Sequence, residues 1–340
     1  MEETSMTGKE RIYAVLQGKK PDMLPVFPKI SFATAKYAGY TVGQYMSDPS
    51  AMSQSVIAAC ERFGWDAVGI TTDISLDGMA LGSKYQLNED APYTLKEPLL
   101  HSLDETDKIV IRDPWDCPGY GTVLRAARET VEKVGDHIFV QAWCNGPLNV
   151  SSQLYDLQEL LMDTIDDPEG VHKLLELCTQ AAISQARALI KAGADAVAFG
   201  HATASPNVIS RDAYCEFALP YEKRIIEAVH QEGGIAITHI CGKIETIVDK
   251  IAENGSDIID FDSANDIQVL LEKTGGKKVF RGNIAPVLFS EGSPEEIKAA
   301  VKDLLARDGG SGKLLLGSGC EVNLNTPEEN LRAFMEAARG

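Results

Sequence analysis

The sequence predicts an α/β protein built as a (β/α)8 barrel with an N-terminal helical extension. Short apolar runs typical of buried strands alternate along the chain with longer segments of helical periodicity. Counted from Met23, eight such runs are separated by helical segments. Regular alternation of this kind implies a parallel sheet, and eight units imply that the sheet closes into a barrel.

An open, doubly wound sheet is the alternative architecture. That fold often carries a G-x-G-x-x-G motif after its first strand, and no such motif follows residues 23–27. The glycine-rich segment 309–312 precedes an expected strand rather than a helix, which indicates a turn. We therefore favour the barrel, as a single domain over residues 1–340.

The chain opens with an amphipathic helix over residues 7–17, with Ile12, Val15 and Leu16 on one face. We expect residues 1–22 to form the helical extension, which covers the barrel ahead of the first strand. Residues 78–103 show no helical period and are expected to form short strands or a loop. The eight expected strands are residues 23–27, 66–70, 137–143, 195–199, 235–240, 257–261, 278–281 and 313–316. The expected helices between and after them are residues 51–63, 124–134, 154–163, 168–192, 212–232, 244–254, 267–273, 294–306 and 327–338.

Composition and charge limit what the protein can bind. Its 340 residues are 44% hydrophobic and 24% charged, which is typical of a globular chain, and its net charge of −18 opposes nucleic acids and anionic membranes. The N-terminus has no apolar core of a signal peptide, and no run of about 18 apolar residues occurs, so we expect a cytoplasmic protein. Seven cysteines without a regular framework fit reduced thiols. Small molecules and other proteins are the expected partners, and a homo-oligomer is compatible with the sequence.

Residues 238–242, with the sequence THICG, carry the chemistry that stands out most clearly. His239 and Cys241 are two positions apart at the end of an expected strand, so they project from the same side of it. Cys320 follows another expected strand, residues 313–316. An H-x-C pair alone is often a satisfied histidine and a packed cysteine, but two cysteine-bearing segments after strands favour a metal site. One imidazole and two thiolates are normal zinc ligands, and three ligands leave a position open for a substrate atom.

Other polar side chains follow the strands on the expected catalytic face of the barrel. Asp262, with Asp260 as the second choice, is the expected fourth zinc ligand, which leaves when substrate arrives. Turn or cap roles are an alternative for several of the remaining residues. The expected substrate-binding residues are Asp73, Asn145, His201 and Asn283, and His201 is also a candidate to support a metal ligand.

With these residues in place, the chain resembles the uroporphyrinogen decarboxylase superfamily from its first helix to its last. The matching landmarks are residues 7–11 leading to Pro25 and Val26, residues 193–196 before residues 204–206, and residues 326–330. Within the superfamily, residues 238–242 and 317–320 look like the zinc motifs of the corrinoid-dependent methyltransferase branch, whose type members methylate coenzyme M.

The resemblance implies a zinc-dependent methyltransferase with catalytic residues His239, Cys241 and Cys320. It would move a methyl group between a corrinoid and a small substrate, which is a thiol acceptor or a methoxy- or methylamine-type donor. The chain contains no D-x-H-x-x-G motif of a cobalamin-binding module, so the corrinoid should arrive on a partner protein or as a free cofactor.

Departures from the decarboxylases support the same branch. Decarboxylases of this superfamily hold substrate carboxylates with arginines after the first strand, whereas residues 27–33 contain none. Asp73 matches their pyrrole-binding aspartate, but Gln153 and Ser318 stand where they carry a tyrosine and a histidine. The alternatives are a metal-independent decarboxylase of a tetrapyrrole acid, and a corrinoid-binding or chaperone protein without catalysis.

Overall fold

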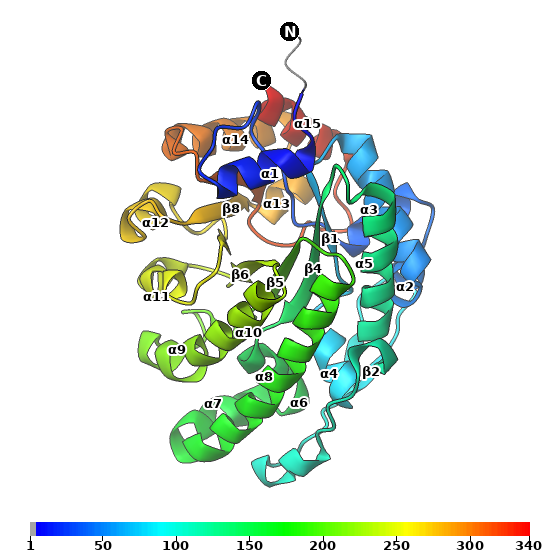
Figure 1. Ribbon diagram of the computed structural model, residues 1–340, viewed down its shortest axis with the longest axis vertical. Coiled ribbons are helices and arrows are strands. Elements are labelled where there is room, and N and C mark those ends of the chain that lie inside the picture. Colours follow the sequence, from blue (N-terminus) through cyan, green and yellow to red (C-terminus); the bar gives the residue numbers. More distant parts are fainter. Residues whose placement is uncertain (1–4) are drawn as a thin grey trace.

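A seven-stranded parallel sheet forms the centre of the molecule in the computed structural model, which describes residues 5–340 (Figure 1). Neighbouring strands in the sheet follow the order β1-β4-β5-β6-β7-β8-β9, so each new parallel strand is added beside the last. The predicted N-terminal extension includes residues 1–4, which lie outside the described part of the chain. The strands are β1 (Ala67–Ile70), β4 (Phe139–Asn145), β5 (Ala196–Gly200), β6 (Ile235–His239), β7 (Ile258–Asp260), β8 (Val279–Ile284) and β9 (Leu314–Ser318).

The predicted first strand, residues 23–27, is reduced to a single parallel bridge between Val26 and Leu316 of β9. Around it, Phe27 N donates to Leu316 O at 2.7 Å, and Leu316 N donates to Pro25 O at 2.9 Å. On the other side, Asp66 N donates to Val26 O at 2.9 Å, just before β1. The ladder is short because Pro25 and Pro28 have no N–H to donate. The segment nevertheless links β9 to the start of β1, and the fold is an α/β barrel of the TIM type.

Helices surround the curled sheet, and most lie where the periodicity predicts them (Figure 1). The predicted helix 212–232 is interrupted at Ala218, before Pro220 in the first turn of the next helix. The predicted helix 154–163 is also two helices, which meet at Tyr155 and Asp156. The helices are α2 (Val42–Ser47), α3 (Pro49–Phe63), α5 (Tyr120–Val134), α6 (Pro147–Leu154), α7 (Leu157–Asp166), α8 (Pro168–Lys191), α9 (Arg211–Phe217), α10 (Leu219–Gln231), α11 (Val248–Ala252), α12 (Ile267–Lys273), α13 (Pro286–Glu291), α14 (Pro294–Asp308) and α15 (Glu328–Arg339).

Helix α1 (Gly8–Leu16) lies across the amino-terminal end of the barrel (Figure 1). Thr7 and Glu10 form a reciprocal capping box at its start, a motif in which replacing the cap residue by alanine typically costs about 1 kcal/mol. Its apolar face buries Ile12 and Val15 in a second core cluster with residues from the beginnings of the strands, including Phe139. The amino end is therefore plugged by side chains, and the carboxyl end is left for chemistry.

Residues 78–103 were expected to lack helix, and that expectation is wrong at their start, where α4 (Leu76–Leu81) forms. The rest contains the expected short strands, β2 (Lys84–Gln86) and β3 (Thr94–Glu97), paired as an antiparallel hairpin. Short 3-10 helices complete the connections at Phe32–Tyr37, Leu103–Lys108, Pro114–Asp116, Ala202–Ala204 and Ile244–Thr246. None of the helices within residues 5–340 combines the length and apolar character that a bilayer crossing requires.

Candidate metal centre

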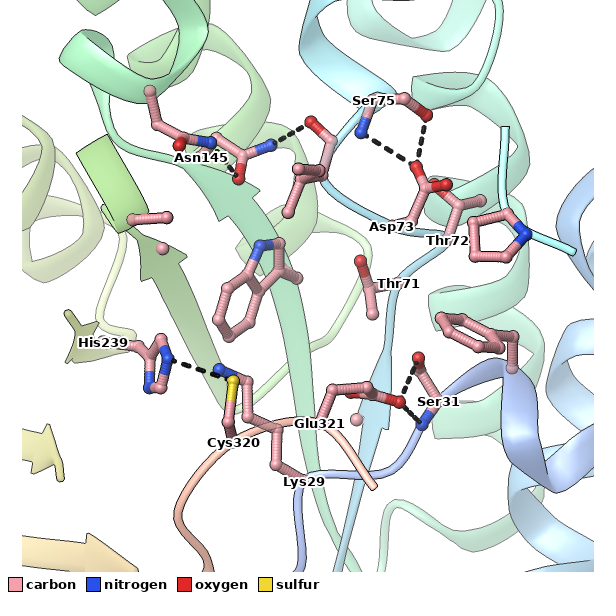
Figure 2. A pocket seen from close by; sticks show the side chains of 18 of the residues that line it. Lys29, Ser31, Thr71, Thr72, Asp73, Ser75, Asn145, His239, Cys320 and Glu321 are labelled. Carbon is pink, nitrogen blue, oxygen red and sulfur yellow. Dashed lines mark hydrogen bonds between the residues drawn. The ribbon is translucent and has the colours of Figure 1, made fainter. Parts of the chain in front are cut away.

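Three potential metal ligands meet at the carboxyl end of the barrel. Figure 2 shows two of them, His239 and Cys320. His239 is the last residue of β6, Cys241 lies two residues further on, and Cys320 follows the end of β9. His239 Nε2 lies 3.2 Å from Cys241 Sγ and 3.8 Å from Cys320 Sγ. Their ligand atoms all lie within 4.8 Å of one another. His239 and Cys320, which are 81 residues apart in sequence, meet here because parallel strands end at the same side of the sheet.

The geometry and chemistry of these three side chains fit a zinc ion. Tetrahedral zinc with ordinary Zn–N and Zn–S bond lengths places a ligand nitrogen and sulfur about 3.6 Å apart. The two distances from His239 Nε2, 3.2 and 3.8 Å, bracket that value. One imidazole and two sulfurs also match the ligands that zinc prefers. The spacing of these three side chains therefore matches that of three zinc ligands.

A buried ion pair supports the imidazole from behind. Asp260 Oδ2 lies 3.5 Å from His239 Nδ1, and Arg281 Nε donates to Asp260 Oδ1 at 2.7 Å. Burial acts to raise the pKa of Asp260, but the Arg281 guanidinium and His239 more than offset it and hold that pKa well below its usual range. An ionised carboxylate facing Nδ1 favours the tautomer with its proton there, which leaves Nε2 free to bind a metal. Arg281 also donates to Gln141 Oε1 at 2.6 Å.

The pKa values of the two thiols shift in opposite directions. A hydrogen bond between them lowers the pKa of Cys320 and raises the pKa of Cys241 far above its usual range. Burial opposes ionisation of both thiols, and the nearby Lys29 ammonium favours it. Zinc binds both sulfurs as thiolates, so metal binding has to release any proton that they still carry.

The cluster opens into a cavity of about 610 Å³ (Figure 2). Asp73 and Asn145, two of the expected substrate-binding residues, line it. Asp73 accepts hydrogen bonds from Ser75 N at 2.8 Å and Tyr93 N at 3.0 Å, so it ties the β2–β3 hairpin to the loop after β1. Burial raises its pKa. Asn145 Nδ2 donates to Ile74 O at 3.1 Å. Both side chains hold loops around the cavity.

His201 and Asn283 are not among the residues that line this cavity. His201 is fully buried, and its Nδ1 lies 2.6 Å from Glu222 Oε1. A Cβ atom at Gly146 would lie 1.6 Å from His201 Nε2, so this packing requires glycine at that position. Asn283 Nδ2 donates to Asn265 O at 3.0 Å. The hydrogen bonds of His201 and Asn283 therefore hold the loops around the strand ends together and do not face the cavity.

Asp262, the fourth ligand expected from the sequence, lies outside the group of three converging ligand atoms. Its Oδ2 accepts a hydrogen bond from Gly242 N at 3.0 Å, directly after the Cys241 position. Asp260, the second choice, pairs with Arg281 and faces the outer nitrogen of His239. Asp262 therefore contacts the backbone next to Cys241, and Asp260 contacts His239 on the side away from the two cysteines.

Several residues of the site were not singled out from the sequence. Trp143, an interior residue of β4, has its ring centroid 6.0 Å from that of His239, and Lys29 Nζ lies 4.2 Å from the Trp143 ring centroid. Glu321 accepts hydrogen bonds from Ser31 N at 2.6 Å and Ser31 Oγ at 2.7 Å, and burial raises its pKa to about 7. The position of Glu321 beside the Cys320 motif was a usable signal. Only the folded barrel indicates that Trp143 and Lys29 face the same cavity.

Together the fold and the site define a class: parallel α/β barrels with a candidate metal site of one histidine and two cysteines at the carboxyl end. The profile of the uroporphyrinogen decarboxylase (URO-D) family matches residues 7–340. The chain belongs to that family.

The similar proteins within the family include both methyltransferases and decarboxylases. The chain is 27% identical to the methylcobamide:CoM methyltransferase MtbA of Methanosarcina mazei, over 99% of this chain and 98% of the relative. It is 28% identical to a uroporphyrinogen decarboxylase of Chlorobium phaeovibrioides, over 77% of this chain and 75% of the relative. The fold is also that of a solved methyltransferase from Methanosarcina mazei, with a TM-score of 0.89, 24% identity and 98% of each chain covered.

Proposed function

We propose that this protein is a zinc-dependent methyltransferase that moves a methyl group between a corrinoid and a small substrate. The observation that carries the proposal is the convergence of His239, Cys241 and Cys320, which all line the same cavity. The full-length similarity to a methylcobamide:CoM methyltransferase supports the same reaction class.

The proposed roles of the chain's own residues follow from their contacts. His239, Cys241 and Cys320 would hold zinc, and Asp260 orients His239 for that purpose. The zinc would supply a Lewis acid that favours the thiolate form of a substrate thiol, or that polarises the bond between a methyl group and its heteroatom. Trp143 and Phe27 give the cavity apolar walls that limit water around the reacting atoms.

The transfer needs a corrinoid that reaches the cavity. With a thiol acceptor, the sulfur forms the new S–C bond while the methyl–cobalt bond breaks. The cobalt keeps the bonding electrons as cobalt(I), and the thiol proton passes to solvent. We propose that the corrinoid is carried by a partner protein that docks at the carboxyl end of the barrel, since the cavity opens there.

The second candidate is a decarboxylase of a tetrapyrrole acid, which the similarity to uroporphyrinogen decarboxylases favours. That reaction requires cationic side chains for several carboxylates. In this cavity the cationic side chains are Lys29 and Arg281, and Arg281 is already paired with Asp260. Charge therefore favours the methyltransferase.

Measurement of zinc content and two activity assays distinguish the two candidate functions. We expect one zinc per chain, lost in Cys241→Ser and in Cys320→Ser but retained in the control Cys215→Ser, whose half-buried thiol lies on α9. Methyl transfer from methylcobalamin to a small thiol should disappear with the zinc. Turnover of uroporphyrinogen by a zinc-free chain would establish the second candidate instead.

A further inference from the structure

We propose that the turn formed by residues 201–205 positions two of the metal ligands, His239 and Cys241, and that the buried side chain of Glu222 anchors this turn. The inference rests on the proposed metal-dependent function and makes Glu222 and Ser205 positioning residues for it. Neither residue lines the cavity, so both would act through the backbone of the segment that carries the two ligands.

The turn holds a backbone carbonyl group of each ligand. His201 N donates to His239 O at 2.9 Å, which continues the ladder between β5 and β6 beyond the end of β5. Four residues later, Ser205 Oγ donates to Cys241 O at 2.7 Å. A short 3-10 helix, with a hydrogen bond of 3.1 Å from Ala204 N to His201 O, joins the two contacts. The relative position of the His239 and Cys241 backbones therefore depends on this single turn.

Glu222, in the first turn of α10, fixes the start of the 201–205 turn. Its Oε1 lies 2.6 Å from His201 Nδ1, and both side chains are fully buried. Burial acts to raise the pKa of Glu222, but the hydrogen bond from His201 and those from its other partners more than offset burial and lower that pKa. On its other edge the His201 ring packs against Gly146, where a Cβ atom would lie 1.6 Å from Nε2. The ring is therefore held from two sides.

A second path connects Glu222 to the strand that carries His239. Glu222 Oε2 accepts hydrogen bonds from Tyr214 Oη at 2.7 Å and from Asn254 Nδ2 at 2.9 Å. The Asn254 amide also donates to Thr238 Oγ1 at 3.0 Å. Thr238 directly precedes His239 in β6, and neighbouring strand residues point to opposite faces. This contact therefore holds β6 from the helix side, while His239 faces the barrel interior.

The cost of burying a carboxylate indicates a role in geometry as well as in folding. A buried charged network is often no more stabilising than apolar side chains of the same volume. A metal site, by contrast, requires its ligand atoms to be held within about 0.5 Å of the productive arrangement. The 3.2 Å between His239 Nε2 and Cys241 Sγ is the distance that the 201–205 turn would set.

Ser205→Ala and Glu222→Gln test this positioning role. Zinc affinity is measured by competition with a chelator, and the absorption spectrum of the Co²⁺-loaded protein reports the thiolate ligands and the geometry of the site. Neither measurement needs turnover. Loss of a group that supports a metal ligand typically lowers metal affinity 10- to 100-fold. We expect affinity to fall about 10-fold in each variant, with altered d–d bands and retained sulfur-to-cobalt charge transfer.

Ser55→Ala is the matched control. Ser55 Oγ is also buried and donates to a backbone carbonyl group, Ala51 O at 2.6 Å, but it lies within α3. Both serine variants lose one buried hydrogen bond and should lose similar stability in urea. Only Ser205→Ala should change the zinc affinity and the cobalt spectrum, because a purely structural role would leave both unchanged in the folded protein.

If Glu222→Gln does not fold, Ser205→Ala decides the proposal. Wild-type affinity and spectrum in Ser205→Ala would overturn it, and so would a wild-type chain that binds neither Zn²⁺ nor Co²⁺. Unchanged metal binding in folded Glu222→Gln would overturn the anchoring role of that residue. Weakened metal binding in Ser205→Ala, without methyl transfer by the wild type, would support the positioning role and refute the proposed function.

Discussion

Asp260→Asn tests whether the buried ion pair orients the candidate zinc ligand. The substitution keeps the shape of the side chain but removes the charge that faces His239 Nδ1 at 3.5 Å and pairs with Arg281. Loss of such a partner behind a metal-binding histidine typically lowers metal affinity 10- to 100-fold, or about 1.4 to 2.7 kcal/mol. We expect zinc affinity to fall by that amount.

The same substitution should lower stability even without zinc. Arg281 has an exposed fraction of 2% and would keep a buried charge without its partner, which costs about 3 to 5 kcal/mol. That is a large part of an ordinary folding free energy of about 5 to 15 kcal/mol. Urea unfolding of the metal-free protein measures this loss separately from zinc binding.

Zinc affinity is measured by competition with a chromogenic chelator at fixed pH. Asp262→Asn is the matched control, because its amide oxygen can still accept the hydrogen bond from Gly242 N. We expect it to retain one zinc per chain with little loss of affinity. Wild-type zinc affinity in folded Asp260→Asn would refute the orienting role, and a large loss in Asp262→Asn would make Asp262 a ligand.

Three further predictions concern protons and packing. Zinc affinity should fall as pH is lowered from about 8 to 5, because thiolate ligands must lose protons, and titration against the chelator across this range measures it. Asp77 is buried on α4, and burial raises its pKa from 3.8 to about 6. The folded state therefore binds this proton more tightly than the unfolded state, and the carboxyl lowers stability as pH rises from about 4 to 6. Asp77→Asn should therefore gain up to about 3 kcal/mol relative to wild type between those pH values in urea unfolding, and a pH-independent difference would contradict it. Gly146→Ala should lower the thermal midpoint, because its Cβ would lie 1.6 Å from buried His201 Nε2; an unchanged midpoint would show that His201 can move.

The candidate metal ligands could be predicted from the sequence because their spacing has a local meaning. His239 and Cys241 lie two positions apart at a strand end, and Cys320 follows another strand. In a parallel barrel both strand ends belong to one face, so their proximity follows from the fold class alone. Asp260 was singled out from the sequence as a possible ligand, but its pairing with Arg281 had no such signal. Asp260 and Arg281 lie on neighbouring strands in register, a relation that only the pairing of β7 with β8 creates.

The fold class was determined by the sequence, because the alternation of apolar runs and helical periodicity is a property of the chain itself. The shortness of the first strand follows from Pro25 and Pro28, but the bridge between Val26 and Leu316 depended on how the barrel closes. Tertiary structure also decided what each polar loop residue does. His201 packs against Gly146 and Glu222, whereas Lys29 lines the cavity and contacts the Trp143 ring. The physical reason is that hydrogen-bond partners and burial depend on segments distant in sequence, while periodicity depends on neighbours.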